Sequence, residues 1–192
     1  LASSAAQMCI RDSFRATALR EGGENASYSR EFAFSKSTGR PAVLNTKPND
    51  SYTFEGASLL VDGYHSRPVF TSGAWLGYLD EPLDVTIDMG GEQSYRSVEL
   101  ETLAEKGDWI FPPSSVTVWV SDNGTDFTEV ASVAVPEAKA GDADGIGRYR
   151  MQFPETSARY LKVVAQNAAA IPAWHPGAGS KGFLFVDEVV VE

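Results

Sequence analysis

The chain has 192 residues, of which 43% are hydrophobic and 22% charged, an ordinary composition for a globular protein with one good core. Its formal net charge is −10: residues 1–55 carry seven Lys/Arg and six Asp/Glu, whereas residues 56–192 carry nine and twenty. This acidity counts against nucleic acid and anionic membranes as partners, but a neutral glycan or a divalent cation is compatible with it. No apolar run is long enough to span a bilayer.

We do not expect the first thirteen residues to belong to the fold. Residues 7–12 back-translate to the end of a transposon adapter used in sequencing libraries, so we expect residues 1–13 to be an artefact; the alternative is a disordered tail. The only cysteine, Cys9, lies in this segment. Without it, the chain has no disulfide and no thiolate metal site.

Two strands are predicted next, over residues 14–19 and 27–34, joined by a turn-rich connection. Two strands alone are marginally stable, so we interpret residues 14–35 as the last hairpin of a truncated β-domain. Residues 36–55 contain Gly39, Pro41 and Pro48 and are predicted to be a linker. The change in charge near residue 55 also predicts a domain boundary there.

From residue 56 onward, short strands follow one another between Gly, Pro, Asp and Asn turns. Val116, Val118 and Val120 share one face of a strand, and residues 83–89 alternate in the same way. No stretch has a helical period. The predicted strands cover residues 83–89, 97–102, 115–120, 127–130, 149–153, 158–165 and 183–191. This pattern predicts an all-β sandwich or jelly roll.

Four segments in this region resemble the factor V/VIII type C (discoidin) domain, also called carbohydrate-binding module family 32. They are the loop with Asp62 and Gly63, the strand over residues 85–90, the turn in residues 118–124 and the strand over residues 158–163. The resemblance covers residues 56–192. It implies a galactose-binding-like jelly-roll β-sandwich in an extracellular or periplasmic protein, and we expect a monomer.

A narrower resemblance involves residues 51–57, 107–112 and 174–179, which are similar to the C-terminal module of bacterial β-N-acetylhexosaminidases of glycoside hydrolase family 20. In those enzymes a small β-domain precedes the module. The resemblance therefore implies that the hairpin belongs to such a domain, and that a parent catalytic domain is a partner in cis.

The family commonly holds a structural Ca²⁺, which binds several carboxylate and carbonyl oxygens. Asp62 matches the family's loop aspartate and Glu188 matches its C-terminal glutamate, so the resemblance implies that these two are the metal ligands. The family's second acid after the Asp-Gly pair is missing here. The alternative is that Asp62 accepts backbone N–H bonds in a turn and that Glu188 is solvated.

A sugar ring has an apolar face and a rim of hydroxyls, so its site needs an exposed aromatic ring and a few polar groups. In this fold we expect the site on loops at one end of the sandwich. The expected carbohydrate-binding residues are Trp174, His175 and Lys181 in residues 171–181, then Trp109, then Tyr64 and His65.

Each aromatic candidate also has a structural interpretation. Trp109 and Trp174 could seal the end of the core, and His175 could fasten its Pro/Gly loop through a backbone hydrogen bond. We expect Trp75 to lie in the core. Trp119 is expected on a sheet face or beneath the preceding domain.

The functional hypotheses follow from these residues. Catalysis is not expected, because the chain has two His and neither a G-x-S-x-G nor an H-E-x-x-H pattern. The first hypothesis is a non-catalytic module that binds a glycan and keeps its parent enzyme there. The alternative is a structural module that packs against the catalytic domain, which would place apolar surface on a sheet face instead of the loops. The third hypothesis is a lipid-binding module, and the negative charge of the chain disfavours it.

Overall fold

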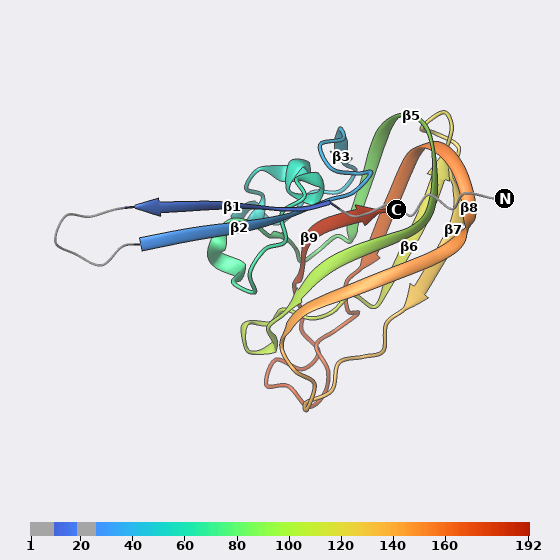
Figure 1. Ribbon diagram of the computed structural model, residues 1–192. Coiled ribbons are helices and arrows are strands. Elements are labelled where there is room, and N and C mark those ends of the chain that lie inside the picture. The colour runs from blue at the N-terminus through green and yellow to red at the C-terminus, as the bar shows by residue number, and fades with distance from the viewer. Residues whose placement is uncertain (1–9, 19–25) are drawn as a thin grey trace.

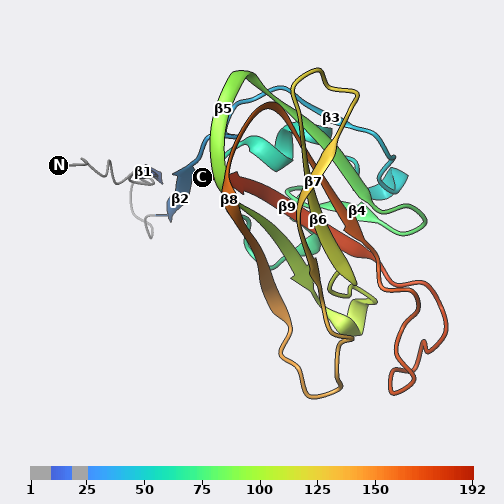
Figure 2. The ribbon, with the colours of Figure 1, turned by 90° about the vertical axis from the view of Figure 1, so that its right-hand side faces the viewer.

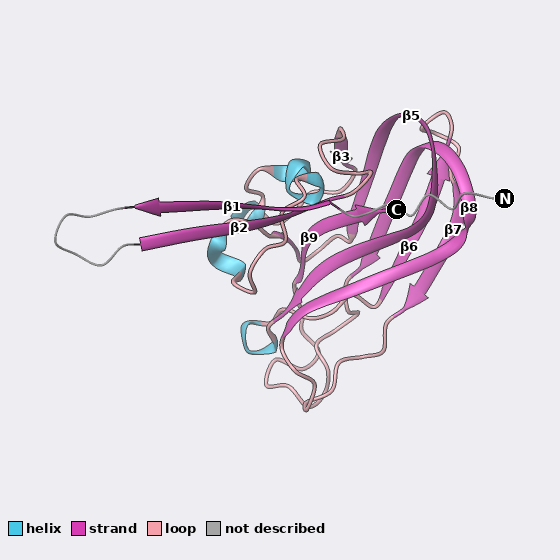
Figure 3. Cartoon of the chain, viewed as in Figure 1, coloured by secondary structure: helices cyan, strands magenta, loops and turns pink. Residues whose placement is uncertain are grey.

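The computed structural model describes residues 10–18 and 26–192, which consist of β-strands and four short 3₁₀ helices (Figure 1, Figure 3). The predicted all-β class is confirmed. The strands are β1 (Ile10–Ala18), β2 (Ala26–Phe34), β3 (Ala42–Leu44), β4 (Leu76–Tyr78), β5 (Leu83–Ala104), β6 (Ser115–Ser121), β7 (Thr128–Ala134), β8 (Gly145–Gln166) and β9 (Leu184–Val191). The 3₁₀ helices are η1 (Asp50–Tyr52), η2 (Gly56–Val61), η3 (Phe70–Ser72) and η4 (Lys106–Asp108). None of the helices in the described ranges is long and apolar enough to cross a membrane.

One antiparallel sheet folds over on itself to make the two layers of the sandwich. Its order is β4-β9-β5-β8-β6-β7, with β3 beside β5. Residues 83–88 of β5 pair with β8 and lie in the layer of β3, whereas residues 97–104 pair with β8 and belong to the layer of β9. The register shifts between Asp88 and Gln93, next to Gly90 with a φ of 79°, and both long strands bend there.

Alternating side chains from both layers form the core, as the sequence pattern predicts. The buried aliphatic and methionine side chains of β5 and β6 are Leu83, Val85, Ile87, Met89, Val98, Leu100, Leu103, Val116, Val118 and Val120. Each buried aliphatic side chain stabilises the fold by about 1.5–3 kcal/mol relative to exposure. Trp75 is also fully buried, as expected, and its Nε1 donates to the carbonyl of Arg67 at 3.0 Å.

The predicted linker over residues 36–55 is wrong, because this stretch packs on the sandwich. Ser37 is buried and donates to the carbonyl of Val189 at 2.5 Å, and β3 pairs with β5. The backbone N–H of Asn49 donates to Gly77 at 2.8 Å. Because residues 36–55 pack on the sandwich in this way, the domain begins before residue 56. The sequence did not show this, because a three-residue strand after Pro41 has too little alternation to be recognised.

The hairpin of β1 and β2 projects from the sandwich (Figure 1). Phe32 forms a β-bridge with Tyr64, and their rings lie 5.9 Å apart. That the hairpin ends a truncated domain stays a prediction. Of the predicted artefact over residues 1–13, residues 1–9 lie outside the described part, and the remaining four are in β1.

Three connections meet at one end of the sandwich, away from the bend in β5 and β8 (Figure 2). They join β5 to β6 through η4, β7 to β8, and β8 to β9. Ile110 and Phe183 form a parallel bridge between the first and the third, and the ion pair of Lys106 with Asp144 joins the first to the second. Below, these connections are called the loop end.

Candidate functional site

Trp109 lies at the loop end, immediately after η4. Its backbone is in the left-handed region, with a φ of 64°, a conformation that costs about 1–2 kcal/mol for an L-residue. The carbonyl of Trp109 accepts from Phe183 N at 2.8 Å, and its own N–H donates to Lys106 at 3.0 Å. These bonds hold the strained residue so that 43% of it is exposed.

Trp174 lies on the β8–β9 connection and is 40% exposed. Its Nε1 donates to the carbonyl of Ala138 on the β7–β8 connection at 2.9 Å. The indole N–H is therefore used within the protein, while a large part of the ring faces solvent. Neither loop tryptophan seals the core.

His175 holds the two tryptophans together. Its Nε2 donates to the carbonyl of Lys106 at 2.9 Å, and its Nδ1 accepts from the N–H of Gly177 at 3.0 Å, an arrangement that requires the tautomer protonated on Nε2. The ring centroid of His175 lies 6.2 Å from Trp109 and 5.6 Å from Trp174, edge to face in both cases. Because both nitrogens have protein partners and the residue is buried, the geometry favours the fastening role of His175 over contact with a sugar.

Gly177 allows Trp109 to pack against the β8–β9 connection. A Cβ at this glycine would lie 2.9 Å from Cζ2 of Trp109, which is closer than real side chains come. Phe111 completes the cluster, with its ring 5.5 Å from His175 and 6.4 Å from Trp174. The sequence analysis missed Phe111; its position in the same loop as Trp109 is the only signal for it.

The other predicted sugar-binding residues have different partners. Lys181 forms an ion pair with Asp80 at 2.6 Å, which links the β8–β9 connection to the turn between β4 and β5. Tyr64 contacts Phe32, and His65 Nδ1 lies 2.9 Å from Oε2 of Glu101. The structure therefore brings Trp109, Trp174 and His175 into one cluster and places Tyr64 and His65 on another connection.

Tyr64 and His65 belong to a loop that covers three buried carboxylates, those of Glu101, Asp187 and Glu188. The loop forms one hydrogen bond with each carboxylate. Gly63 N donates to Glu188 at 3.2 Å, Ser66 N donates to Asp187 at 2.7 Å, and the imidazole of His65 bonds with Glu101. The sequence analysis did not single out Glu101 or Asp187. Two adjacent acids inside the apolar strand β9 were the available signal for a buried site.

The predicted metal ligands lie at this acidic site. Burial raises the pKa of Asp187 to about 8 and that of Glu188 to about 10, and the nearby Asp62 carboxylate adds to the second rise. Oε1 of Glu188 is buried without a hydrogen-bond partner, which a hard cation would satisfy. Asp62 is exposed and accepts from Tyr64 N at 2.7 Å.

The donor set near Asp62 and Glu188 fits Ca²⁺ only with help from the backbone. Among residues 10–18 and 26–192, no group of three or more His, Cys, Asp or Glu side chains is placed to hold a metal ion. Ca²⁺ needs six to eight oxygen ligands, so backbone carbonyls would supply the rest.

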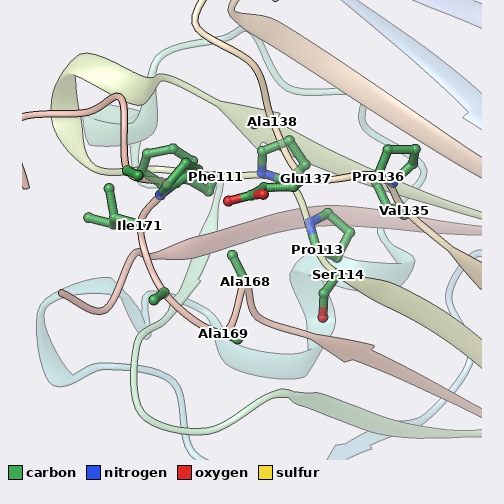
Figure 4. Close-up of a pocket in the computed structure, with 14 residues that line it drawn as sticks. Phe111, Pro113, Ser114, Val135, Pro136, Glu137, Ala138, Ala168, Ala169 and Ile171 are labelled. Atoms are coloured by element: carbon green, nitrogen blue, oxygen red, sulfur yellow. The ribbon is translucent and has the colours of Figure 1, made fainter. Parts of the chain in front are cut away.

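A pocket of about 420 Å³ lies beside the aromatic cluster (Figure 4). Phe111 and Ile171 are buried residues of its wall, and Ala173 and Ala138 connect it to Trp174. Its lining residues are Phe111, Pro112, Pro113, Ser114, Val135, Pro136, Glu137, Ala138, Ala168, Ala169, Ala170, Ile171, Pro172 and Ala173. Proline fixes its backbone angle, so the four prolines make this pocket largely preformed.

Residues 45–181 match the F5/8 type C domain family. The chain belongs to this family. The predicted discoidin resemblance is thereby confirmed, whereas the resemblance to hexosaminidase modules stays a prediction. No curated protein sequence matches the chain.

Solved structures of sugar-binding modules share the fold at low sequence identity. Chitosan-binding module 1 of a chitosanase/glucanase from Paenibacillus sp. IK-5 has a TM-score of 0.53 and 17% identity, over 83% of this chain and 98% of that one. The module CpGH89CBM32-5 of Clostridium perfringens, solved with GalNAc-β-1,3-galactose, has a TM-score of 0.51 and 16% identity, over 79% and 93%. A fucose-binding module of Streptococcus pneumoniae has a TM-score of 0.50 and 22% identity, over 82% and 94%.

Proposed function

We propose that this domain is a non-catalytic carbohydrate-binding module that binds glycans through the exposed indole faces of Trp109 and Trp174. The observation that carries the proposal is the position of both rings at one end of the sandwich, 43% and 40% exposed and joined by His175. An aromatic face matches the C–H face of a sugar ring. Similar structures include chitosan-binding and fucose-binding modules, which supports the proposal.

The loop that carries Trp174 is already ordered by its own hydrogen bonds. Ile171 N donates to Ser180 O at 2.8 Å, Gly179 N to Ile171 O at 3.0 Å, and Ala178 N to His175 O at 3.0 Å. Little conformational entropy is then lost when a sugar stacks on the ring, and preorganisation of this kind increases affinity.

The role of the module would be to hold a parent enzyme on its substrate. Linking a weak binding site to a catalytic domain raises the effective concentration of substrate near that domain. We propose that the parent is a glycoside hydrolase, of the β-N-acetylhexosaminidase type that the sequence resembles, working outside the cytoplasm. Sequencing the gene upstream of this segment tests the placement, and an upstream catalytic domain of another type would contradict it.

The sugar-binding proposal is tested by a glycan array followed by calorimetry on the glycans that bind. Trp109→Ala and Trp174→Ala are each expected to weaken binding about tenfold, the scale of one aromatic stacking contact. Trp119→Ala is the matched control, because this half-buried tryptophan lies on β6 and not at the loop end. Wild-type protein that binds no glycan, or equal losses in all three variants, would contradict the proposal.

We also propose that Asp62 and Glu188 bind a structural Ca²⁺, which would satisfy the unpartnered Oε1 of Glu188. Ca²⁺ at one hundred times its dissociation constant would stabilise the fold by about 2.7 kcal/mol. We expect the melting temperature to rise with Ca²⁺, to fall again with a chelator, and to lose this response in Glu188→Gln. A melting temperature that neither Ca²⁺ nor chelator changes would contradict the metal site.

The structural alternative has some support outside the loop end. Phe34, Phe54 and Val69 are 44%, 46% and 48% exposed, and exposed apolar residues can pack against a neighbouring domain. The two functions are compatible, because Phe34, Phe54 and Val69 all lie outside the loop end. Co-purification of the module with a separately expressed catalytic domain tests the alternative.

A further inference from the structure

The pocket beside Trp174 combines an apolar wall with one unpaired charge. Of its fourteen lining residues, Glu137 is the only charged one, and it is exposed. No ion pair or hydrogen bond of the Glu137 side chain occurs within the described part of the chain. Figure 4 draws its carboxylate turned toward the side of the pocket where Phe111 lies. Ser114 offers a hydroxyl, but that hydroxyl already donates to the carbonyl of Asn167 at 2.8 Å.

The chemistry of a fitting ligand follows from this lining. Contact with proline and alanine carbons favours an apolar surface such as a C–H face, and an unpaired carboxylate at the edge favours a cation. The net charge of −10 attracts a cationic ligand and repels an anionic one. The volume of about 420 Å³ lies within the range of small-molecule sites and suits a compact ligand.

The pocket adjoins the proposed glycan site through two residues next to Trp174. Ala173 lines the pocket and precedes Trp174 in the chain, and Ala138, which accepts the Trp174 N–H bond, lines it as well. A glycan stacked on Trp174 can therefore extend into the pocket with its next residue.

We propose that this pocket is a second subsite that binds an amino sugar with a free, protonated amine, with Glu137 as the partner of the ammonium group. The inference rests on the proposed sugar binding and adds to it the class of sugar. Trp109 and Trp174 supply affinity for sugar rings in general, and Glu137 discriminates a glycan that carries amines from its neutral counterpart.

The test compares three β-1,4-linked tetramers, of glucosamine, N-acetylglucosamine and glucose, by calorimetry at low salt. The wild type is expected to bind the glucosamine tetramer most tightly. Glu137→Gln keeps the size of the side chain and removes its charge, so it should weaken glucosamine binding about fivefold, as for an exposed ion pair, and leave the other two unchanged. High salt should remove the difference between wild type and Glu137→Gln.

A second variant tests the pocket independently of the charge. Ala169 is exposed and lines the pocket, so the larger side chain of Ala169→Leu narrows the pocket without entering the core. An unchanged melting temperature is the control for correct folding. Weaker binding of the glucosamine tetramer by this variant supports the subsite.

Three outcomes would overturn the inference: Glu137→Gln binds glucosamine as tightly as wild type, the acetylated tetramer binds the wild type equally well, or a lysine-rich peptide binds the wild type and the glucosamine tetramer does not. Failure of the proposed glycan binding itself would give other results. In that case no glycan binds the wild type, or the two loop-tryptophan variants bind neutral glycans like wild type.

Discussion

Replacing His175 with alanine removes the side chain that contacts both loop-end tryptophans. Two hydrogen bonds are lost, at 2.9 Å to the Lys106 carbonyl and at 3.0 Å from the Gly177 N–H, and both partners are buried. At about 1 kcal/mol for each bond and about 0.5–1.5 kcal/mol for an aromatic pair, we expect a destabilisation of about 2–4 kcal/mol. For a chain of this length, this destabilisation would lower the melting temperature by about 10 °C.

The assay is urea unfolding followed by fluorescence, with glycan affinity measured on the same samples. His175→Gln keeps a donor for the Lys106 carbonyl and is expected to recover about 1 kcal/mol relative to His175→Ala. Both variants should also bind glycans more weakly, because the tryptophan rings lose their support. If His175→Ala unfolds within about 0.5 kcal/mol of wild type and yet loses binding, His175 contacts the sugar directly and the fastening role is refuted.

Two further predictions follow from local geometry. Gly177→Ala should displace the ring of Trp109, because the new Cβ would lie 2.9 Å from Cζ2, and should weaken glycan binding; Gly107→Ala, which meets no atom within 4 Å, is the control. Hydrogen bonds from Arg159 and Gly90 lower the pKa of Asp88 to about 2, below the value of about 3.9 for an unfolded aspartate. The stability that Asp88 contributes is therefore present above about pH 4 and is lost as the pH falls toward 2. Asp88→Asn should flatten the acid limb of a plot of unfolding free energy against pH, and an unchanged limb would contradict this.

The strands could be predicted where alternation is long enough to be read. In β5, apolar and polar residues alternate from Leu83 to Met89, because one face of each layer is buried and the other is wet. The same reasoning failed for β3, whose three residues are held by pairing with β5, a partner about forty residues away in sequence. Pairing that distant depends on tertiary context and leaves little local signal.

The exposure of the loop-end tryptophans could be predicted from the sequence, but the contacts around them could not. Exposed tryptophans in Pro/Gly loops indicated a stacking surface, and both Trp109 and Trp174 are exposed. The sequence did not distinguish a sugar-contacting histidine from a fastening one, because that depends on the partners of each ring nitrogen. It also did not indicate that His65 would pair with Glu101, which lies on β5, thirty-six residues further along the chain.

The residues of the loop end fall into two groups, those that order the loops and those that we propose contact a ligand. His175 and the Lys106–Asp144 pair satisfy the polar groups beneath the surface, so the indole faces can be exposed without the loops becoming disordered. An indole face stacks on many sugars, and on its own it gives affinity with little discrimination. An unpaired carboxylate such as Glu137 adds the opposite property, because it favours a cationic partner strongly only where salt does not screen it. If both proposals hold, affinity and selectivity depend on different residues, and substitutions at the loop end should change one without the other.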